Sequence, residues 1–351
     1  MDPFTQGVFG SLFAQAGTRR KHIRPAAAVA FVGGMSPDLD VLIRSSNDSL
    51  LALEYHRHFT HSLAFIPAAA ALVALVAWPL VSRWRPDVKF ARVFAWSLLG
   101  VASHGVLDAM TSYGTRLLWP FSDERIAWNS ISVIDPLFTI PLAVLLGLAV
   151  WKQSRKGALV AALWAIMYLA FGTLQQHRAE QIVSRWADDV GIEANRVIAK
   201  PSFANLVLWR GLVDDGRRMH VVAVRILPGS EPRLWRGSAV LHHDRDKKRE
   251  ERRDAAGKTS RLEHDLERFR HFSDDWLFRY YSYDHSGDER STVFVGDLRY
   301  AIDPAGVRPL WGIRFDPDQP SEPVRFERPA RIVESERGAF VDRLMGRDPP
   351  P

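Results

Sequence analysis

Long uncharged apolar runs alternate with short basic stretches through the first half of the chain. The runs at residues 62–81, 133–151 and 157–175 each approach the ~20 residues that a helix needs to cross a bilayer. Buried helices of a soluble protein are the alternative, but these rarely lack a polar stripe over such a length. Two further runs, at residues 26–43 and 93–111, carry ionisable side chains, and we interpret them as spans whose polar ends reach an interface or an internal cavity. The pattern predicts about five spans.

After the last of these runs the chain becomes rich in charge and its apolar stretches become short. Residues 177–193 have the pattern of an amphipathic helix, and residues 205–227 predict two strands around an Asp-Gly turn. Residues 291–302 predict another strand. Residues 242–269 are a charge run, typical of a solvated helix or loop, and the Pro-rich tail from residue 316 is expected to be poorly ordered.

The fold class that follows is an α-helical integral membrane domain over residues 1–175, followed by a soluble α+β C-terminal domain over residues 176–351. The first half holds 15 of the 46 Lys and Arg residues and 10 of the 40 Asp and Glu residues. The charge-rich half is therefore almost neutral, and a pI of 9.7 does not indicate direct nucleic-acid binding. The chain has no cysteine, so a metal would have to be held by His, Asp or Glu.

The basic residues between the apolar runs predict an orientation. With the N-terminus inside, the inner segments hold 11 of the 15 basic residues of this half, and the outer loops hold Arg44, Arg57, Arg116 and Arg125. Because Lys and Arg favour the cytoplasmic side, the C-terminal domain is expected on the outer side.

Unusual polar residues collect at the predicted outer ends of the spans. "HGVLD" places His104 and Asp108 one helical turn apart, where they can grip one metal ion or form a structural hydrogen bond. "SPDLD" supplies Asp38 and Asp40 after a proline that breaks the helix, although Asp38 could also serve as a cap. "HRHFTHS" adds histidines to the same face, of which His58 could be a plain interfacial aromatic. His and Asp from three segments at one face indicate a metal site.

We expect Asp40, His61, His104 and Asp108 to be ligands, while Asp38 and His56 bind a second ion or support the first. A spare carboxylate, Asp38 or Asp135, is expected to accept a proton from the attacking water. Arg57 and Arg116 are expected to hold a phosphate, or else to anchor the chain at the interface.

Four stretches together carry a family resemblance: "GGMSPDLDVLI", "HRHFTHSL", "HGVLDAMTSYGTRLLWPFS" and "IDPLF". With them, residues 1–175 resemble the LexA-binding, inner-membrane-associated hydrolases, also described as membrane-bound metal-dependent hydrolases. That family commonly shows HRGxTHS, where this chain has His58 for the glycine, and many members carry a histidine near Gln6. A weaker local similarity is to the zinc phospholipase C and P1 nuclease group, which also uses an HxxxD helix.

These observations predict a multi-pass protein of the bacterial inner membrane, with its C-terminal domain on the periplasmic side. The expected activity is metal-dependent hydrolysis of a phosphoester in an amphiphilic, phosphate-containing substrate, with a divalent ion, zinc first, as cofactor. The alternative is a non-catalytic protein with a structural metal and a C-terminal domain that binds a protein partner. A transporter is disfavoured because the polar groups cluster at one face instead of at the midplane.

Overall fold

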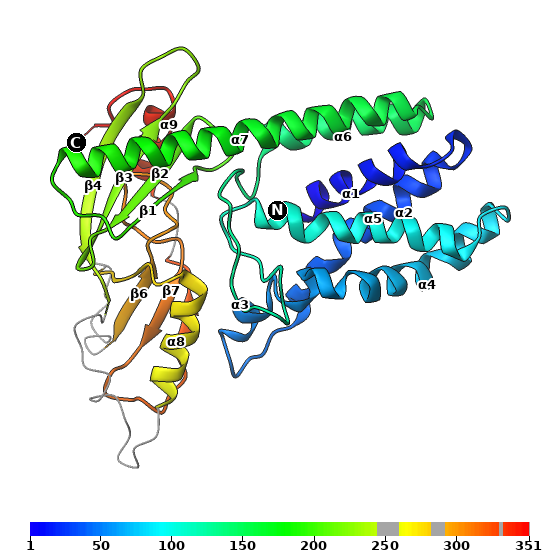
Figure 1. Cartoon of the computed structure of the whole chain (residues 1–351). Helices are drawn as coiled ribbons and strands as arrows, with labels where there is room; N and C mark the ends of the chain where they lie inside the picture. The colour runs from blue at the N-terminus through cyan, green and yellow to red at the C-terminus, as the bar shows by residue number, and fades with distance from the viewer. Residues whose placement is uncertain (244–259, 282–291, 330–332, 351) are drawn as a thin grey trace. The chain divides into compact units, whose positions relative to one another are not determined.

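The structure of the chain is a computed structural model that describes residues 1–243, 260–281, 292–329 and 333–350 (Figure 1). The chain divides into two units. The membrane unit comprises Met1–Ile43, Tyr55–Gln175 and Phe203–Leu206, and the C-terminal unit comprises Arg44–Glu54, Gln176–Ser202 and Val207–Pro351. The division differs from the predicted one chiefly because residues 44–54, which precede the second predicted span, belong to the C-terminal unit.

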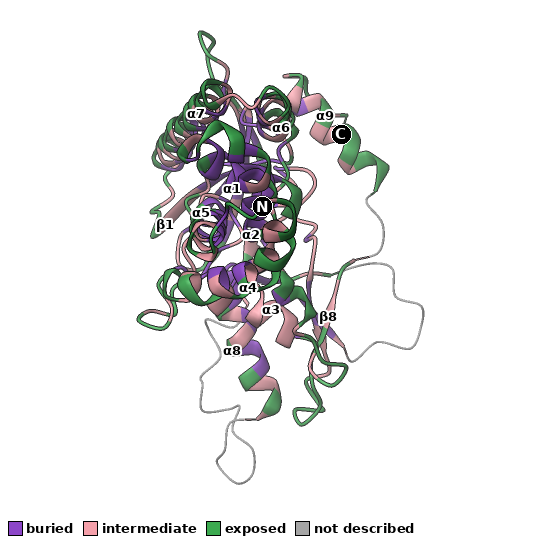
Figure 2. Ribbon diagram, turned by 90° about the vertical axis from the view of Figure 1, so that its right-hand side faces the viewer, coloured by how far each residue is buried: buried purple, intermediate pink, exposed green. Residues whose placement is uncertain are grey.

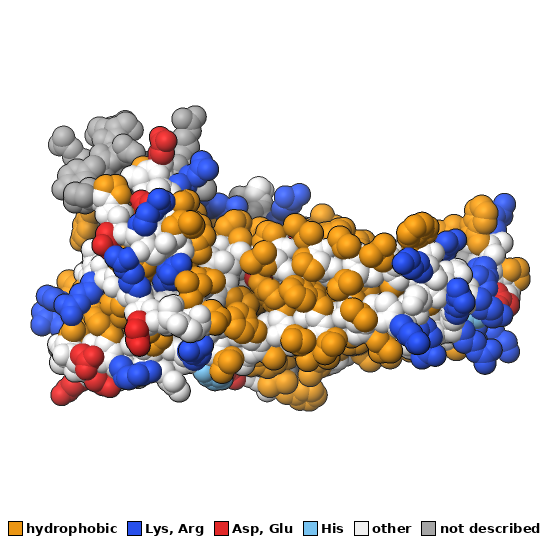
Figure 3. Space-filling view, turned by 90° about the horizontal axis from the view of Figure 1, so that it is seen from above, with side chains coloured by type: hydrophobic (Ala, Val, Ile, Leu, Met, Phe, Trp, Pro, Cys, Tyr) orange, Lys and Arg blue, Asp and Glu red, His pale blue; other side chains and the backbone are white. Residues whose placement is uncertain are grey.

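Apolar helices build the membrane unit. Their bounds are α1 (Pro3–Gly17), α2 (Ile23–Met35), α4 (Ile66–Trp84), α5 (Phe90–Ala109), α6 (Pro136–Trp151) and α7 (Arg155–Asp189). The shorter elements between them along the chain are η1 (Arg20–His22), η2 (Ser36–Leu42), α3 (Leu51–Tyr55), η3 (Phe59–His61) and η4 (Leu63–Phe65). Apolar side chains line the outside of the long helices (Figure 3), as expected for a surface that faces lipid.

Within the described residues, three helices are long and apolar enough to cross a membrane: Leu63–Trp84, Phe90–Ala109 and Arg155–Asp189. Three of the predicted spans are therefore confirmed as helices of that kind. The predicted span at 133–151 is the shorter helix α6, with 16 residues. The predicted span at 26–43 is divided, because α2 ends at Met35 and the part with the acids is the 3-10 helix η2. The count of five stays a prediction.

Helix α1 was not predicted. Asp2 caps it by accepting from the Thr5 amide at 3.0 Å, and Pro3 occupies its first turn, where the missing N–H costs nothing. Helix α1 packs against α2 and α5, and the amino group of Met1 contacts the Asp108 carboxylate near the end of α5. Residue 1 therefore lies at the same end of the bundle as the predicted site residues. The predicted topology had required the N-terminus at the opposite, cytoplasmic end.

The basic segments meet at the other end of the bundle. Lys21, after α1, pairs with Asp87, between α4 and α5, at 2.8 Å. Arg155, at the start of α7, donates to the Ala16 carbonyl near the end of α1 at 3.1 Å. Figure 3 shows the resulting cluster of Lys and Arg side chains at one end of the helices. The predicted inner loops are therefore neighbours in space, as a single membrane face requires.

Helices α1, α2 and α5 pack at very short range, and buried residues gather where they meet (Figure 2). A Cβ on Gly100 of α5 would lie 2.3 Å from the Ala30 carbonyl oxygen of α2, so only glycine allows this approach. Small residues at such crossings are typical of helices that associate in membranes, where close packing replaces the hydrophobic effect.

Two antiparallel sheets build the C-terminal unit. The first has the order β1-β2-β3-β4 and the second β5-β6-β7-β8. Their strands are β1 (Arg196–Pro201), β2 (Leu208–Asp214), β3 (Arg218–Arg225), β4 (Arg233–Leu241), β5 (Leu277–Arg279), β6 (Val293–Asp297), β7 (Gly312–Phe315) and β8 (Arg325–Glu327). Helices α8 (Arg261–Ser273) and α9 (Glu334–Leu344) complete the unit. The predicted pair of strands at 205–227 and the strand at 291–302 are confirmed as β2, β3 and β6.

Two predictions for this unit are borne out only in part. Residues 177–189 are helical as predicted, but they continue α7 without a break from the apolar segment, and the helix ends at Asp189 instead of residue 193. The tail beyond residue 316 is not irregular throughout, since it contains strand β8 and helix α9. Part of the charge run at 242–269 lies outside the described residues, and its end forms α8, capped by Ser260.

Strand β1 places Lys200 directly opposite Arg210 of β2, and both side chains are buried. Arg210 donates to backbone carbonyls, including that of Leu298 at 2.8 Å. The Lys200 ammonium instead lies 3.2 Å from the centroid of the Tyr300 ring, and no described residue accepts a hydrogen bond from it. Burial, reinforced by the nearby Arg299 guanidinium, holds the pKa of Lys200 well below its usual range.

Candidate metal centre

Helix η2 carries two acids away from lipid and two apolar side chains toward the outside. The chain leaves α2 at Met35, and Pro37 lies in the first turn of the 3-10 helix. Asp40 is buried, with 2% of its surface exposed, whereas Leu39 and Leu42 are 63% and 66% exposed. Acidic and apolar residues alternate along this segment of the sequence. The tighter winding of the 3-10 helix places the acids on one side and the leucines on the other.

The histidine-rich segment is held in an unusual backbone conformation. Arg57 has φ +60°, in the left-handed region, which costs a non-glycine residue about 1 kcal/mol or more. In this conformation its amide donates to Asp40 Oδ2 at 2.9 Å. The chain then enters η3, which ends at His61, a residue with only 2% of its surface exposed.

Helix α5 supplies the other wall of the site. His104 and Asp108 are fully buried and one turn apart, on the face that α1 and α2 cover. Gly105 lies beside them, and a Cβ at this position would be 2.2 Å from the His61 carbonyl oxygen. The absence of a side chain at Gly105 is what lets η3 approach the helix closely enough for His61 to meet His104.

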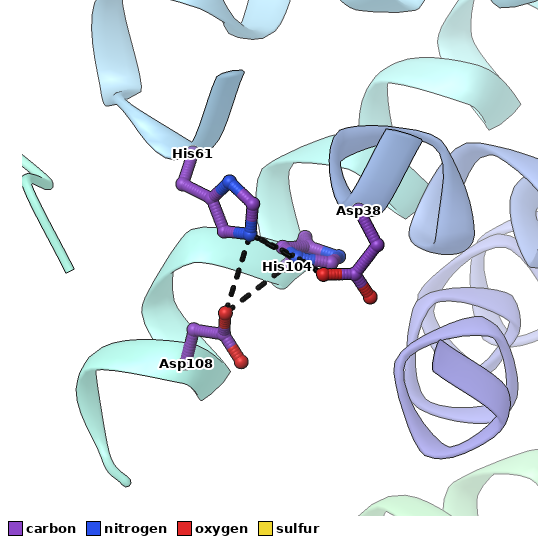
Figure 4. Close-up of side chains that lie close together, drawn as sticks. All are labelled: Asp38, His61, His104 and Asp108. Atoms are coloured by element: carbon purple, nitrogen blue, oxygen red, sulfur yellow. Dashed lines mark hydrogen bonds and ion pairs between the residues drawn. The ribbon is translucent and has the colours of Figure 1, made fainter. Parts of the chain in front are cut away.

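Four side chains converge on one point (Figure 4). His61 Nε2 lies 2.8 Å from His104 Nε2, 3.3 Å from Asp108 Oδ2 and 3.5 Å from Asp38 Oδ1. His104 Nε2 lies 3.7 Å from Asp108 Oδ2 and 3.5 Å from Asp38 Oδ1. A tetrahedral ion with bonds of about 2.0–2.2 Å separates its ligand atoms by about 3.3–3.6 Å, so the group already has nearly the right size.

Both imidazoles are oriented from behind. The Nδ1 atom of His104 lies 2.5 Å from the Gly34 carbonyl oxygen, so it must carry the proton that it donates there. The Nδ1 atom of His61 lies 2.9 Å from Thr60 Oγ1, and Thr60 donates to Asp40 Oδ2 at 3.1 Å. These partners leave the Nε2 atoms of both rings free to offer lone pairs, the arrangement of metal-bound histidines.

The group of acids demands a positive charge at its centre. Burial alone would lower the pKa of His61, but the carboxylates of Asp108, Asp38 and Asp40 raise it to about 10. Asp38 Oδ2 and Asp108 Oδ2 are buried, and no described residue donates a hydrogen bond of good geometry to either atom. Two facing Nε2 lone pairs repel each other unless a proton or a metal ion lies between them. Buried carboxylates and paired imidazoles therefore fit a divalent cation.

Arg57 does not face the solvent, contrary to what its predicted loop position suggested. Its Nε lies 3.0 Å from Asp108 Oδ2, and its Nη1 donates to Thr111 Oγ1 at 2.8 Å. The guanidinium also lies 4.8 Å from the centroid of the Tyr113 ring. It thus holds Asp108 in place and neutralises part of the acidic charge.

The other predicted site residues lie around the group. Asp40 is one step behind it, between His56 Nδ1 at 2.9 Å and His61 Nδ1 at 3.2 Å. His56 is the more exposed of the two rings. The group therefore contains Asp38, which is predicted as a proton acceptor or as a ligand or support of an ion, while Asp40, which is predicted as a ligand, contacts the Nδ1 side of His61 instead. His58 packs against Tyr55 and Trp119, as an interfacial aromatic would.

Asp135 and Arg116 are not in the group. Asp135 caps α6 by accepting from the Phe138 amide at 3.2 Å, and it accepts from the Tyr168 hydroxyl at 2.8 Å. The Arg116 amide donates to the Arg57 carbonyl oxygen at 3.0 Å. The Arg116 guanidinium lies 3.3 Å from the carboxylate of Asp123, an exposed residue.

Residues of α1 and α2 also contribute, and the sequence did not reveal them. Gln6 Nε2 donates to Asp108 Oδ1 at 2.7 Å and lies 3.3 Å from the His104 carbonyl oxygen. The only indication was that Gln6 stands where the resembled family carries a histidine. The Gly34 carbonyl could not have been anticipated, because a backbone acceptor leaves no mark on residue type.

Comparison with known proteins agrees with the membrane assignment. The model of a family described as YdjM inner membrane protein matches residues 1–179. The uncharacterized protein YfhP of Bacillus subtilis (strain 168) is 28% identical over 192 residues, which cover 54% of this chain and 55% of YfhP. The chain thus matches about half the length of that curated relative. No solved structure matches it. The membrane part of the resemblance is confirmed, and the hydrolase part stays a prediction.

Proposed function

Since the chain belongs to the YdjM inner membrane protein family, we propose that its membrane unit is a metal-dependent hydrolase that cleaves a phosphoester of an amphiphilic substrate. The observation that carries the proposal is the pair of imidazoles whose Nδ1 atoms are fixed by Gly34 and Thr60 and whose Nε2 atoms face each other at 2.8 Å. A metal ion between the two Nε2 atoms would remove the repulsion of their lone pairs and bind the nearby carboxylates as well.

His61, His104 and Asp108 are the proposed ligands. Two histidines and one carboxylate are a known catalytic zinc set, which leaves a position open for water or substrate. A divalent ion at this place would polarise that water and a phosphoryl oxygen. Zinc is the first candidate, because imidazole and carboxylate without thiolate suit it and other divalent transition ions.

Asp38 is the proposed proton acceptor. It is the member of the group with measurable side-chain exposure, 11%, so it lies on the side from which water and substrate arrive. Its Oδ1 is 3.5 Å from both Nε2 atoms, farther than these atoms are from each other. A carboxylate at this distance can accept a proton from the attacking water and pass it to the leaving group.

Arg57 and Asp40 are positioning residues in this proposal, and Asp135 is a helix cap. Arg57 would have to leave Asp108 before it could hold a phosphate, so Arg116 is the better phosphate partner. Its ion pair with the exposed Asp123 is weak, and a phosphate can replace it.

The proposed substrate is amphiphilic because exposed apolar side chains share the short helix η2 with its acids. Leu39 and Leu42 are exposed on the same short helix that carries Asp38. Leu118 and Phe121, in the loop after α5, are 42% and 89% exposed. In a membrane these side chains meet lipid tails, so a molecule with an acyl chain and a phosphate can lie against the leucines and present its phosphate to the ligands.

The positive-inside rule supports a periplasmic site and C-terminal domain. The basic loops lie at the end of the bundle opposite the ligands, and α7 begins among them at Arg155. If α7 crosses the bilayer once from that end, the chain that follows it is periplasmic, as proposed.

A structural metal is the second candidate, and the fourth carboxylate favours it. If Asp38 binds the ion as well, the site is closed by four protein ligands, as in structural zinc sites. The protein would then act through a partner bound to its C-terminal domain.

Two variants separate these functions in detergent-purified protein. Asp108→Asn should lose both the co-purifying metal and the cleavage of a lipid-like phosphoester in mixed micelles. Asp38→Asn should keep the metal and lose cleavage by about 100-fold or more if it is the proton acceptor. Loss of the metal from Asp38→Asn favours the closed structural site instead.

Asp87→Asn is the matched control, since Asp87 lies at the opposite end of the bundle. A chelator should abolish cleavage, and added metal should restore it. If the metal-loaded wild type cleaves no phosphoester, the hydrolase proposal fails and the partner-binding function becomes the better one.

A further inference from the structure

Residues 44–54 connect the two segments that carry Asp40 and His56, yet they belong to the C-terminal unit. We call this stretch the strap. The strap begins at Arg44, two residues after the end of η2 at Leu42. Its last residue, Glu54, comes two positions before His56. The strap thus belongs to the C-terminal unit, while the segments that precede and follow it in the chain carry residues of the candidate metal centre.

One side chain of α8 holds the strap at two points. Arg268 Nη2 lies 2.9 Å from Asp48 Oδ2 and 2.8 Å from Glu54 Oε2, and its Nε donates to Glu54 at 2.9 Å. Asp265, one turn before it on α8, accepts from Nη1 at 3.1 Å. The Arg268 side chain is 14% exposed, so the contacts are partly shielded from water. Three carboxylates around one guanidinium form a network, which is stronger than an isolated surface pair.

The rest of the strap is also anchored. Ser49 Oγ donates to the Val324 carbonyl at 2.8 Å and accepts from the Phe326 amide at 3.0 Å, so it binds along the edge of β8. Leu50 has 2% of its surface exposed. A surface loop that merely linked two helices would need none of these contacts.

The consequence for the site follows from the chain itself. Glu54 lies in α3, whose last residue is Tyr55, so Arg268 fixes the helix from which His56 and Arg57 emerge. Arg57 must then adopt φ +60° to donate to Asp40 and reach Asp108. A strained residue persists only where its surroundings hold it, and the strap is the part of those surroundings nearest in sequence.

We propose that Arg268 is a positioning residue for the metal centre, which acts through Asp48 and Glu54 to keep the Arg57–His61 segment in its metal-binding conformation. The proposal rests on the proposed function in one respect, namely that the centre binds a metal. It gives the C-terminal unit a role in the membrane unit's chemistry: a partner that loosens the strap from α8 would weaken the centre.

The test is metal affinity of the full chain in detergent, measured by competition with a chromophoric chelator. Arg268→Ala should weaken binding about tenfold or more, the effect of losing support behind a ligand. Arg270→Ala is the matched control on the same helix, since within the described residues Arg270 forms ion pairs with Glu267 and Asp275 and none with the strap. Glu54→Gln removes the negative charge of the same contact from the strap side and should weaken binding in the same direction, by less than Arg268→Ala.

Cobalt supplies a readout that a general loss of stability would not move. The visible spectrum of cobalt-loaded Arg268→Ala should change in shape as well as in apparent affinity, and that of Arg270→Ala should match the wild type. If the wild type binds metal and Arg268→Ala binds it equally well with the same spectrum, the positioning role is refuted while the metal centre stands. If the wild type binds no metal, both proposals fall.

Discussion

Gly105→Ala is the sharpest perturbation of the proposed centre, because it changes no ligand and adds only a methyl group. The new Cβ would lie 2.2 Å from the His61 carbonyl oxygen, whereas real Cβ contacts are essentially never under 3.0 Å. The η3 backbone must therefore withdraw by about 0.8 Å. Metal–ligand distances tolerate only about 0.2 Å, so a withdrawn His61 no longer coordinates well.

The size of the effect follows from the cost of an overpacked contact. Forcing a methyl group into such a place costs about 1–3 kcal/mol, and at 1.4 kcal/mol per factor of ten this weakens metal binding about 5- to 150-fold. Competition with a chelator measures the affinity, and thermal unfolding in the presence of excess chelator reports whether the helices remain intact.

Gly147→Ala is the control for the same exchange in a helix. Gly147 lies in α6, and a Cβ there would meet nothing within 4 Å. The control should keep wild-type metal affinity and gain about 1 kcal/mol of helix propensity. Wild-type affinity in Gly105→Ala, or an equal loss in Gly147→Ala, would show that the closeness of η3 to α5 does not govern the site.

Three further outcomes are expected. A reporter that is active only outside the cytoplasm should give signal when fused after residue 190, and a silent fusion would reverse the proposed orientation. Asp40→Ala should weaken metal binding about 10- to 100-fold without abolishing it, because Asp40 supports His61 from behind, and complete loss would make it a ligand. Lys200→Met should raise the unfolding midpoint of the C-terminal unit at neutral pH. Because the pKa of Lys200 is depressed in the folded protein, the unfolded chain binds more protons, and wild-type stability rises with pH toward about 10.4. The stability advantage of the variant should therefore shrink as the pH approaches that value. A constant advantage at every pH would contradict this account of Lys200.

The sequence revealed much of the membrane unit because lipid imposes a simple pattern. Long apolar runs became helices, and basic loops that are far apart in the chain met at one end. Helix α1 was missed because "FTQGVFGSLFAQAG" is interrupted by glycines and polar residues, which read as breaks. In the bundle these same residues are buried against α2 and α5, where small side chains permit close contact.

The sequence indicates which residues belong to the candidate site better than it indicates how their side chains are arranged. His61, His104 and Asp108 were recognised as members of one cluster from their residue types and from the i, i+4 spacing. Which of Asp38 and Asp40 faces the centre depends on the 3-10 winding of η2, and two acids separated by one residue do not disclose it. The inward direction of the Arg57 side chain is hidden for a related reason, since a left-handed backbone conformation has no signature in a segment with the composition of an outer loop.

The strap could not have been predicted from local pattern. Asp48, Ser49 and Glu54 look like ordinary loop residues, and their partners in α8 and β8 lie more than 200 positions away in the chain. Such long-range contacts leave no periodicity to recognise, so only the folded structure assigns the stretch to the C-terminal unit.

The short helices α1 and α2 set the depth at which this centre meets the bilayer. With 15 and 13 residues they rise only about 22 and 20 Å, against about 30 Å for α5 and for a typical hydrocarbon core. His104 lies 14 residues after Phe90, about 21 Å along α5, and so below the outer boundary of such a core. In the proposed orientation, a bilayer of that thickness would have to become thinner beside α1 and α2 for lipid headgroups to reach the level of His104. Membrane thickness thereby becomes a determinant of access: a thin bilayer brings headgroups to the level of the ligands, and a thick one keeps them above it.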